Sequence, residues 1–176
     1  MPGIDESRTF APVHIAILTI SDTRGEEEDR SGPVLVVRAT KAGHQIVRRE
    51  RSTDDKARIE EILRRLIDDP DVDVVISTGG TGVTGRDVTP EAFRAVYEKE
   101  IEGFGELFRW MSFKHIGTST IQSRATAGVA KGKYLFALPG SPGACKDAWD
   151  EILVHQLDIR YRPCNFVELM PRLKER

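Results

Sequence analysis

The sequence predicts an α/β protein, a three-layer α/β/α sandwich around a mostly parallel, mixed central sheet. Two observations lead to this prediction. Short apolar, β-branched runs alternate along the chain with segments whose apolar residues recur at helical spacing. Glycine-rich turns directly follow two of the predicted strands, as ligand-binding loops do at the carboxyl ends of strands in open α/β sheets. A length of 176 residues is typical of one domain, so we expect residues 1–176 to form a single domain.

The first half of the chain is expected to begin with a loose N-terminal arm over residues 1–12. The apolar run 13–20 predicts a buried strand, and 45–49 predicts a second strand near a sheet edge. Between them, Ser31-Gly32-Pro33 is typical of a helix start, and Gly43 is suited to closing that helix after Ala42.

A second helix is expected after the capping side chains of residues 52–55. Its amphipathic face is Ile59, Ile62, Leu63, Leu66 and Ile67, with the spacing of a helix that lies on a sheet. The β-branched run 72–76 then predicts a buried strand.

The second half is expected to contain helices over 90–99 and 103–112, and a short helical turn over 121–125. Residues 128–130 and 134–138 flank Lys131-Gly132, which predicts a hairpin. The last helix, after residue 142, carries Cys145 and Trp149 on its apolar face, so both are expected in the core. Residues 160–176 show little periodicity and are expected to form an extended tail that wraps the domain or a neighbouring subunit.

Composition narrows the possible functions. The formal net charge is −2, whereas a nucleic-acid surface is usually clearly basic, so no nucleic-acid partner is expected. No apolar run approaches the ~18 residues of a membrane span, and the first residues are too acidic for a signal peptide. Cys145 and Cys164 lie far apart, without metal-ligand or disulfide-framework spacing, which predicts a reducing, cytoplasmic location.

The most informative segment is Ser77-Thr78-Gly79-Gly80-Thr81-Gly82, between a predicted strand and the helix start Thr89-Pro90. Glycines permit positive φ and close approach, and backbone amides and hydroxyls add donors, so the segment predicts a cradle for an anionic group. The alternative is a tight turn that needs glycine only for its geometry. Neither a Walker A loop nor a dinucleotide fingerprint fits, because no lysine follows and the glycine spacing differs.

Three loops are expected to meet at one sheet edge: 21–24, 77–89 and 139–142. Asp87 in the second loop would repel phosphate unless it holds a cation such as Mg²⁺; a salt bridge or a helix cap is an equal alternative. Asp54, taken alone, is interpreted as a helix cap. The hydroxyl and guanidinium groups at positions 112, 119, 123 and 124 suit anions but are also common in ordinary loops. The four histidines show no ligand spacing.

At these residues the chain resembles the MoaB/MogA family of molybdenum-cofactor biosynthesis proteins. The resemblance covers nearly the whole chain. Residues 116–120, 122–125 and 162–166 are similar to the MoaB branch. The motifs that carry it are Thr78-Gly79-Gly80-Thr81-Gly82, Arg86-Asp87-Val88-Thr89-Pro90-Glu91-Ala92, Gly103-Phe104-Gly105-Glu106 and Leu138-Pro139-Gly140.

The resemblance implies a molybdopterin-binding-domain-like fold, assembled as a homotrimer or homohexamer. It also implies that molybdopterin is the substrate and Mg-ATP the co-substrate of an adenylyltransferase that releases pyrophosphate, and that a metal-insertion protein is a partner. Asp87 matches the family's catalytic and magnesium-binding aspartate. Asp54 matches a second catalytic aspartate, although the family often has Pro-Asp where this chain has Thr53-Asp54, so Asp55 is an alternative counterpart.

The residues predicted to bind substrate or phosphate are Ser21, Asp22, Thr78, Gly79, Gly80, Thr81, Gly82, Arg86, Ser112, Ser119, Ser123, Arg124, Pro139, Gly140 and Ser141. Two other functions stay open at this point. One is a carrier that binds molybdopterin without chemistry, and the other is an oligomeric assembly scaffold. The sequence does not distinguish molybdenum from tungsten as the metal inserted downstream.

Overall fold

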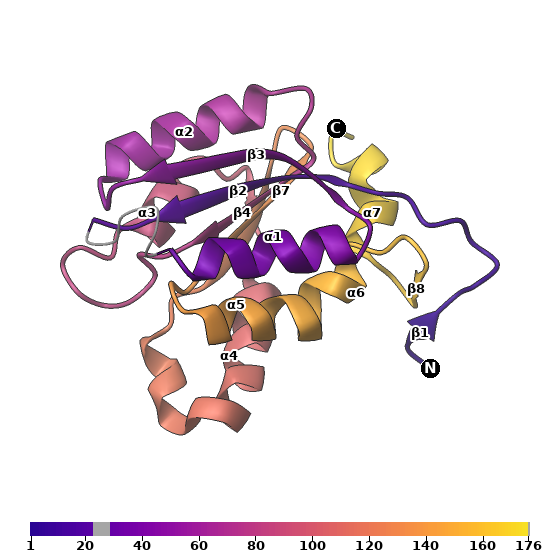
Figure 1. Ribbon diagram of the computed structural model, residues 1–176. Helices are drawn as coiled ribbons and strands as arrows, with labels where there is room; N and C mark the ends of the chain where they lie inside the picture. Colours follow the sequence, from indigo (N-terminus) through magenta and orange to yellow (C-terminus); the bar gives the residue numbers. More distant parts are fainter. Residues whose placement is uncertain (23–28, 176) are drawn as a thin grey trace.

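The computed structural model describes residues 1–22 and 29–175, and its centre is a six-stranded sheet in the order β3-β2-β4-β7-β6-β5 (Figure 1). The strands are β2 (His14–Ile20), β3 (Gln45–Ser52), β4 (Val74–Thr78), β5 (Lys99–Glu100), β6 (Thr126–Ala130) and β7 (Lys133–Leu138). β3, β2, β4 and β7 are parallel, whereas β6 is antiparallel to both of its neighbours. The mixed, mostly parallel sheet is therefore confirmed.

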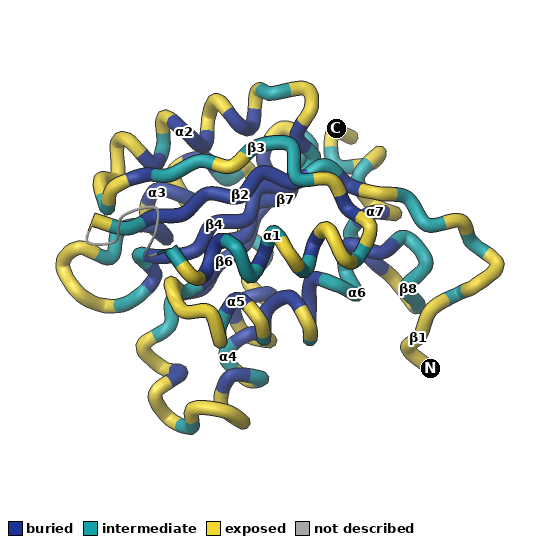
Figure 2. Tube along the Cα trace, viewed as in Figure 1, coloured by how far each residue is buried: buried dark blue, intermediate teal, exposed yellow. Residues whose placement is uncertain are grey.

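Helices cover both faces of this sheet. On one face lie α1 (Ser31–Lys41), α4 (Glu102–Ile116) and α5 (Pro142–Ala148). On the other lie α2 (Lys56–Asp68) and α3 (Thr89–Arg94). Successive residues of β2 alternate between the two cores, because side chains of a strand point to opposite faces. Figure 2 shows the strands as the buried centre between exposed helix surfaces, which confirms the three-layer sandwich.

The apolar patterns that predict these helices also explain their packing. In α2, the five residues Ile59, Ile62, Leu63, Leu66 and Ile67 are all buried. After α5 the helix continues as a π-helical turn, η3 (Trp149–Leu153), into α6 (Val154–Gln156). Cys145 in α5 and Trp149 in η3 are both buried, as predicted. Gly43 has φ 95° just after α1, as expected of a residue that ends a helix.

The predicted helix over 90–99 is wrong at its end. α3 stops at Arg94, and residues 99–100 form β5. The amides of Glu98 and Ile101 donate to carbonyls of β6, so the chain joins the sheet edge. α4 runs four residues beyond the predicted end at Ser112, and the predicted turn over 121–125 lies earlier, as the 3₁₀ helix η2 (Gly117–Gln122).

Both chain ends are more ordered than the sequence predicts. In the arm, β1 (Gly3–Ile4) pairs with β8 (Tyr161–Arg162) from the tail. The tail is not extended: it forms α7 (Phe166–Leu169) and the 3₁₀ turn η4 (Met170–Arg172). The ring of Phe166 lies 4.6 Å from that of Tyr134 on β7, so the tail wraps its own domain. Across the described residues, no helix has the length and hydropathy that crossing a bilayer requires.

Candidate functional site

Loops from the carboxyl ends of four parallel strands meet at one edge of the sheet. The loops after β4 and β7 are joined twice, because the Gly79 amide donates to Leu138 O at 3.0 Å and the Thr78 hydroxyl donates to Pro139 O at 2.9 Å. The loops after β2 and β3 are joined by a reciprocal pair: the Asp22 amide donates to the Asp54 carboxylate, and the Asp54 amide donates to the Asp22 carboxylate. The predicted meeting of these loops is therefore observed for their described residues; Thr23 and Arg24 lie outside them.

Two adjoining cavities open at this edge. The smaller, of about 310 Å³, has an acidic wall that includes Asp22, Asp29 and Asp54. The larger, of about 810 Å³, combines apolar side chains such as Phe108 with serine and threonine hydroxyls. Gly80, Asp87 and Gly140 line both cavities. The Asp87 carboxylate therefore lies in the wall that the two cavities share.

The glycines of the 77–82 segment allow close approach of other parts of the site. Gly79 has φ 113°, and a Cβ at this position would lie 2.0 Å from the carbonyl oxygen of Ile20. At Gly80, with φ 65°, a Cβ would lie 2.9 Å from an Asp54 carboxylate oxygen. Glycine is thus required both for backbone geometry and for bringing Asp54 against the loop.

Fewer amides of the segment are available to a ligand than the sequence predicts. The Gly79 amide is bonded to Leu138, and the Gly82 amide is bonded to the Asp87 carboxylate. Within the described part of the chain, the amides of Gly80 and Thr81 have no such partner. The anion-binding capacity of the cradle therefore depends on those two amides, on hydroxyls and on a cation.

Asp87 is held in place by the loop that carries it. The amide and the hydroxyl of Thr84 donate to its Oδ2 at 2.8 and 2.7 Å. Partial burial acts to raise the pKa of Asp87, but these hydrogen bonds, the Gly82 amide and the Arg124 charge hold it below its ordinary value. Asp87 is therefore a firmly ionised carboxylate at neutral pH.

Asp54 is in the opposite electrostatic situation. Burial raises its pKa, and the nearby charges of Asp22 and Asp87 raise it further, against the Asp22 amide and Arg86, which lower it. The helix cap predicted for Asp54 is instead provided by Asp55, whose carboxylate accepts from the Arg58 amide at 2.8 Å. Asp54 is thus the aspartate of this pair that faces the cavity.

The cavities bring together most of the predicted binding residues. Those that line the smaller cavity are Ser21, Asp22, Thr78, Gly79, Gly80, Arg86 and Gly140. Those that line the larger cavity are Gly80, Thr81, Gly82, Ser112, Ser123, Pro139, Gly140 and Ser141. Several also have a structural role, since the Thr78 hydroxyl joins two loops and the Ser141 hydroxyl accepts from the Ala144 amide as the cap of α5.

Two predicted residues line neither cavity. Ser119 is exposed in η2. Arg124 supports the loop from behind, because its guanidinium donates to the carbonyl oxygens of Gly82 and Asp87 at 2.7 and 2.6 Å and pairs with Glu91. Arg124 thereby fixes the 82–87 backbone.

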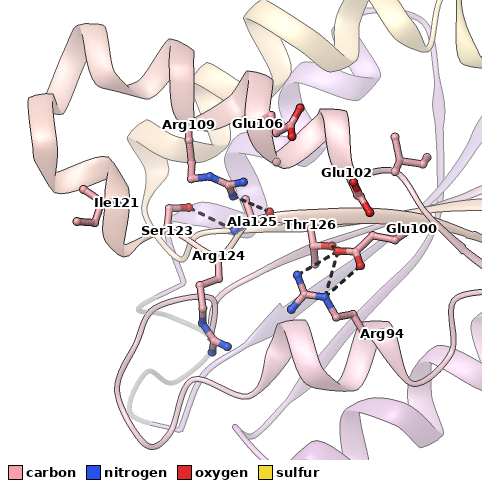
Figure 3. Close-up of a pocket in the computed structure, with 12 residues that line it drawn as sticks. Arg94, Glu100, Glu102, Glu106, Arg109, Ile121, Ser123, Arg124, Ala125 and Thr126 are labelled. Carbon is pink, nitrogen blue, oxygen red and sulfur yellow. Dashed lines mark hydrogen bonds and ion pairs between the residues drawn. The ribbon is translucent and has the colours of Figure 1, made fainter.

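A third cavity, of about 480 Å³, lies on the far side of Arg124 (Figure 3). Figure 3 shows Arg94 paired with Glu100 and Arg109 directed at the Ala125 carbonyl. The N···O distances of these contacts are 3.0 and 3.3 Å. These guanidinium groups are therefore engaged within the protein, and we assign no ligand to this cavity.

Sequence reasoning missed two polar residues of the smaller cavity's framework. Asp29 lines it, accepts from the Thr19 hydroxyl at 2.8 Å and caps α1 through the Ser31 and Gly32 amides. Its position two residues before the predicted helix start was an available signal. The sequence gives no such signal for Thr84, because hydroxyl residues are common in turns and do not indicate which neighbour they contact.

The carboxylates of the smaller cavity suit a magnesium ion shared with a ligand. Among the described residues, no three of them bring oxygen atoms within 4.8 Å of one another. Magnesium usually takes one or two carboxylates and completes its shell with phosphate oxygens and water. Asp87 and Asp54, which both border the glycine segment, fit that requirement.

Comparisons with known proteins agree with this architecture. A family model described as a probable molybdopterin binding domain matches residues 16–159. Molybdenum cofactor biosynthesis protein B of Escherichia coli (strain K12) is 49% identical over 169 residues, which are 96% of this chain and 98% of that protein. A crystal structure of a molybdenum cofactor biosynthesis protein B matches with TM-score 0.85 and 39% identity, covering 96% of this chain and 100% of the other. The tungsten cofactor synthesizing protein MoaB from Pyrococcus furiosus matches with TM-score 0.78 and 32% identity, covering 93% and 98%.

Proposed function

Since the chain belongs to the family of probable molybdopterin binding domains, within its MoaB branch, we propose that it acts in molybdenum cofactor biosynthesis by binding molybdopterin and adenylylating it with Mg-ATP. In this reaction an oxygen of the molybdopterin phosphate attacks the α-phosphorus of ATP. The bond between the α-phosphorus and the bridging oxygen breaks, and pyrophosphate leaves. No nucleophile from the protein is needed.

The observation that carries the proposal is the wall that the two cavities share. A transfer between two anionic reactants requires two binding spaces that meet at one point and a means of reducing repulsion there. Gly80, Asp87 and Gly140 line both spaces. Two adjoining cavities with a carboxylate at their junction favour a transfer between two reactants over a carrier of one small ligand.

The two cavities differ in the chemistry they offer. The larger one combines Phe108 and Ile116 with the hydroxyls of Ser112 and Ser123, which suits a flat heterocycle with polar edges. The acidic smaller one suits a polyphosphate only when a cation accompanies it. We therefore assign molybdopterin to the larger cavity and the magnesium-bound phosphates of ATP to the smaller.

Within the site, the chain's own groups position and neutralise. Asp87 and Asp54 would hold magnesium, which supplies charge neutralisation and aligns phosphate oxygens. The Gly80 and Thr81 amides would bind a phosphate oxygen, and Arg86 adds a positive charge at the rim of the smaller cavity. Thr84 and Arg124 keep Asp87 and its loop in position.

Release of pyrophosphate tests the proposal. Purified protein, molybdopterin and Mg-ATP should yield one pyrophosphate per adenylylated molybdopterin. If molybdopterin binds but no pyrophosphate appears, the carrier function replaces the enzyme. If neither ligand binds, the protein is an assembly scaffold.

A further inference from the structure

A histidine and two carboxylates come together beside the larger cavity. His115 lies in the last turn of α4, and Asp147 and Glu151 lie four residues apart, at the end of α5 and within the π-helical turn η3. His115 Nδ1 is 2.9 Å from Asp147 Oδ2, and its Nε2 is 3.8 Å from Glu151 Oε1. One ligand atom from each residue lies within 4.8 Å of the other two.

This donor set matches a borderline divalent metal ion. Imidazole nitrogen suits Zn²⁺ and similar transition-metal ions, which also accept carboxylate oxygen, and three protein ligands leave a position open for water or a ligand. Bonds of about 2.1 Å in a tetrahedral shell place ligand atoms roughly 3.4 Å apart. The two acids contact different ring nitrogens of His115, only one of which can bind the metal, so the side chains must rotate from the observed contacts to bind one ion together.

The surroundings favour a cation. The cluster places two carboxylates beside one imidazole, and the carbonyl end of α4 adds partial negative charge. The neighbouring cation Lys114 is turned away, with its ammonium 4.2 Å from the ring centroid of Trp110. Lys146 lines the same cavity as His115 and Asp147, and is the charged group that could oppose the metal.

The backbone near Glu151 provides a second, independent indication. The chain departs from regular α-helix at residues 149–153 to form a π-helical turn. Such turns are rare and occur frequently at functional sites. Here the turn carries one of the three candidate ligands, and His115 and Asp147 line the 810 Å³ cavity.

We propose that His115, Asp147 and Glu151 form a binding site for one divalent transition-metal ion of the Zn²⁺ type at the rim of the larger cavity, with its open coordination position available to a cavity ligand. The site shares the larger cavity with Asp87 but uses other residues, and it does not depend on the adenylyltransferase proposal. Spacing along the sequence does not predict it, because His115 and Asp147 are 32 residues apart.

Titration of metal-free, untagged protein with Zn²⁺ alone, and with Co²⁺ monitored by its visible absorption, tests the site. We expect one equivalent per chain, and binding at least about tenfold weaker in His115→Ala and in Glu151→Gln. Excess Mg²⁺ should not compete, because it prefers oxygen ligands and loses water reluctantly. Circular dichroism of each variant checks that the fold is retained, as expected for side chains that are 46% and 32% exposed.

His14→Ala is the matched control. Its imidazole is similarly exposed, at 41%, and lies 3.9 Å from a single carboxylate, that of Asp73. Metal binding should be unchanged in this variant. The proposal is overturned if the native protein binds no Zn²⁺, or if His115→Ala binds as tightly as the native protein, or if His14→Ala weakens binding as much as His115→Ala does.

Discussion

Asp54 and Asp87 are two carboxylates whose surroundings shift their pKa in opposite directions. Donors from Thr84 and Gly82 stabilise the Asp87 anion, whereas burial and two neighbouring acids destabilise the Asp54 anion. As pH falls, Asp54 should therefore take up its proton before Asp87 does. Under the proposed function, magnesium would compete with that proton, so acid should weaken the Asp54–magnesium contact before the Asp87–magnesium contact.

Removing the charge of Asp22 tests this electrostatic arrangement. In Asp22→Asn the amide oxygen can still accept from the Asp54 backbone, but the repulsive charge is lost. We expect the pKa of Asp54 to fall toward its ordinary value, measured by ¹³C NMR of the labelled carboxyl carbon. An unchanged or higher pKa would mean that the Asp22 charge does not act on Asp54.

Asp87→Asn tests the role of the junction carboxylate. The fold should be retained, since asparagine can still accept the Thr84 hydrogen bonds. Turnover should fall at least about a hundredfold with the loss of a charge at the transferring phosphate. The pyrophosphate assay measures it, with Asp55→Asn as the control, because asparagine caps a helix as well as aspartate does. Equal turnover in native protein and Asp87→Asn would remove Asp87 from the mechanism.

At the scale of the element, the loop after β4 depends on glycine at position 79 but not at position 85. Gly79→Ala puts a Cβ against the Ile20 carbonyl at positive φ, so we expect a loss of at least about 2 kcal/mol in the free energy of unfolding. Gly85→Ala, in open space on the same loop, should change it by less than about 0.5 kcal/mol. Urea unfolding measures both, and equal effects would contradict the packing argument.

The loop from Gly82 to Asp87 also depends on Arg124, which precedes β6. Arg124→Ala leaves two loop carbonyls without their donor, which should cost about 1–3 kcal/mol of stability. Arg65→Ala, which removes an exposed pair with Glu50, should cost less than about 1 kcal/mol. Urea unfolding measures both losses, and a smaller loss for Arg124→Ala than for Arg65→Ala would contradict the assigned role of Arg124 in holding the loop.

Elements with strong local patterns could be predicted, and those defined by distant pairing could not. The strand over 13–20 is buried on both faces and therefore has a continuous apolar run. The helix that carries Ile59 to Ile67 is buried on one face and therefore has apolar residues at helical spacing. β5 is two residues long and forms because the amides of the flanking residues Glu98 and Ile101 donate to β6. The local sequence pattern does not indicate this pairing. The tail helix α7 likewise depends on the contact between Phe166 and Tyr134.

The same division applies to the site. The glycine segment, Asp87 and the meeting of the loops follow from residue types and from the parallel order of the strands. The direction of Arg124, the cap at Asp55 rather than Asp54, and the approach of His115 to Asp147 follow from side-chain geometry between distant segments. Sequence spacing contains no information on such contacts.

At the scale of the whole molecule, the family resemblance implies assembly of three or six copies. Leu107, Trp110 and Phe113 of α4 are large apolar side chains that the single chain leaves exposed, which is consistent with association. Light scattering after size-exclusion chromatography should therefore give three or six times the chain mass of 19.7 kDa. A mass of one chain at micromolar concentration would contradict the assembly.

The central claim is that two anionic reactants occupy the adjoining cavities at the same time, on either side of Asp87. Calorimetric titration of an ATP analogue with a non-cleavable α,β-methylene bridge, with Mg²⁺, into protein already saturated with molybdopterin tests it most directly. The account predicts that one analogue binds per chain while molybdopterin stays bound. Displacement of molybdopterin by the analogue would show that the two ligands share one space, and would contradict the account.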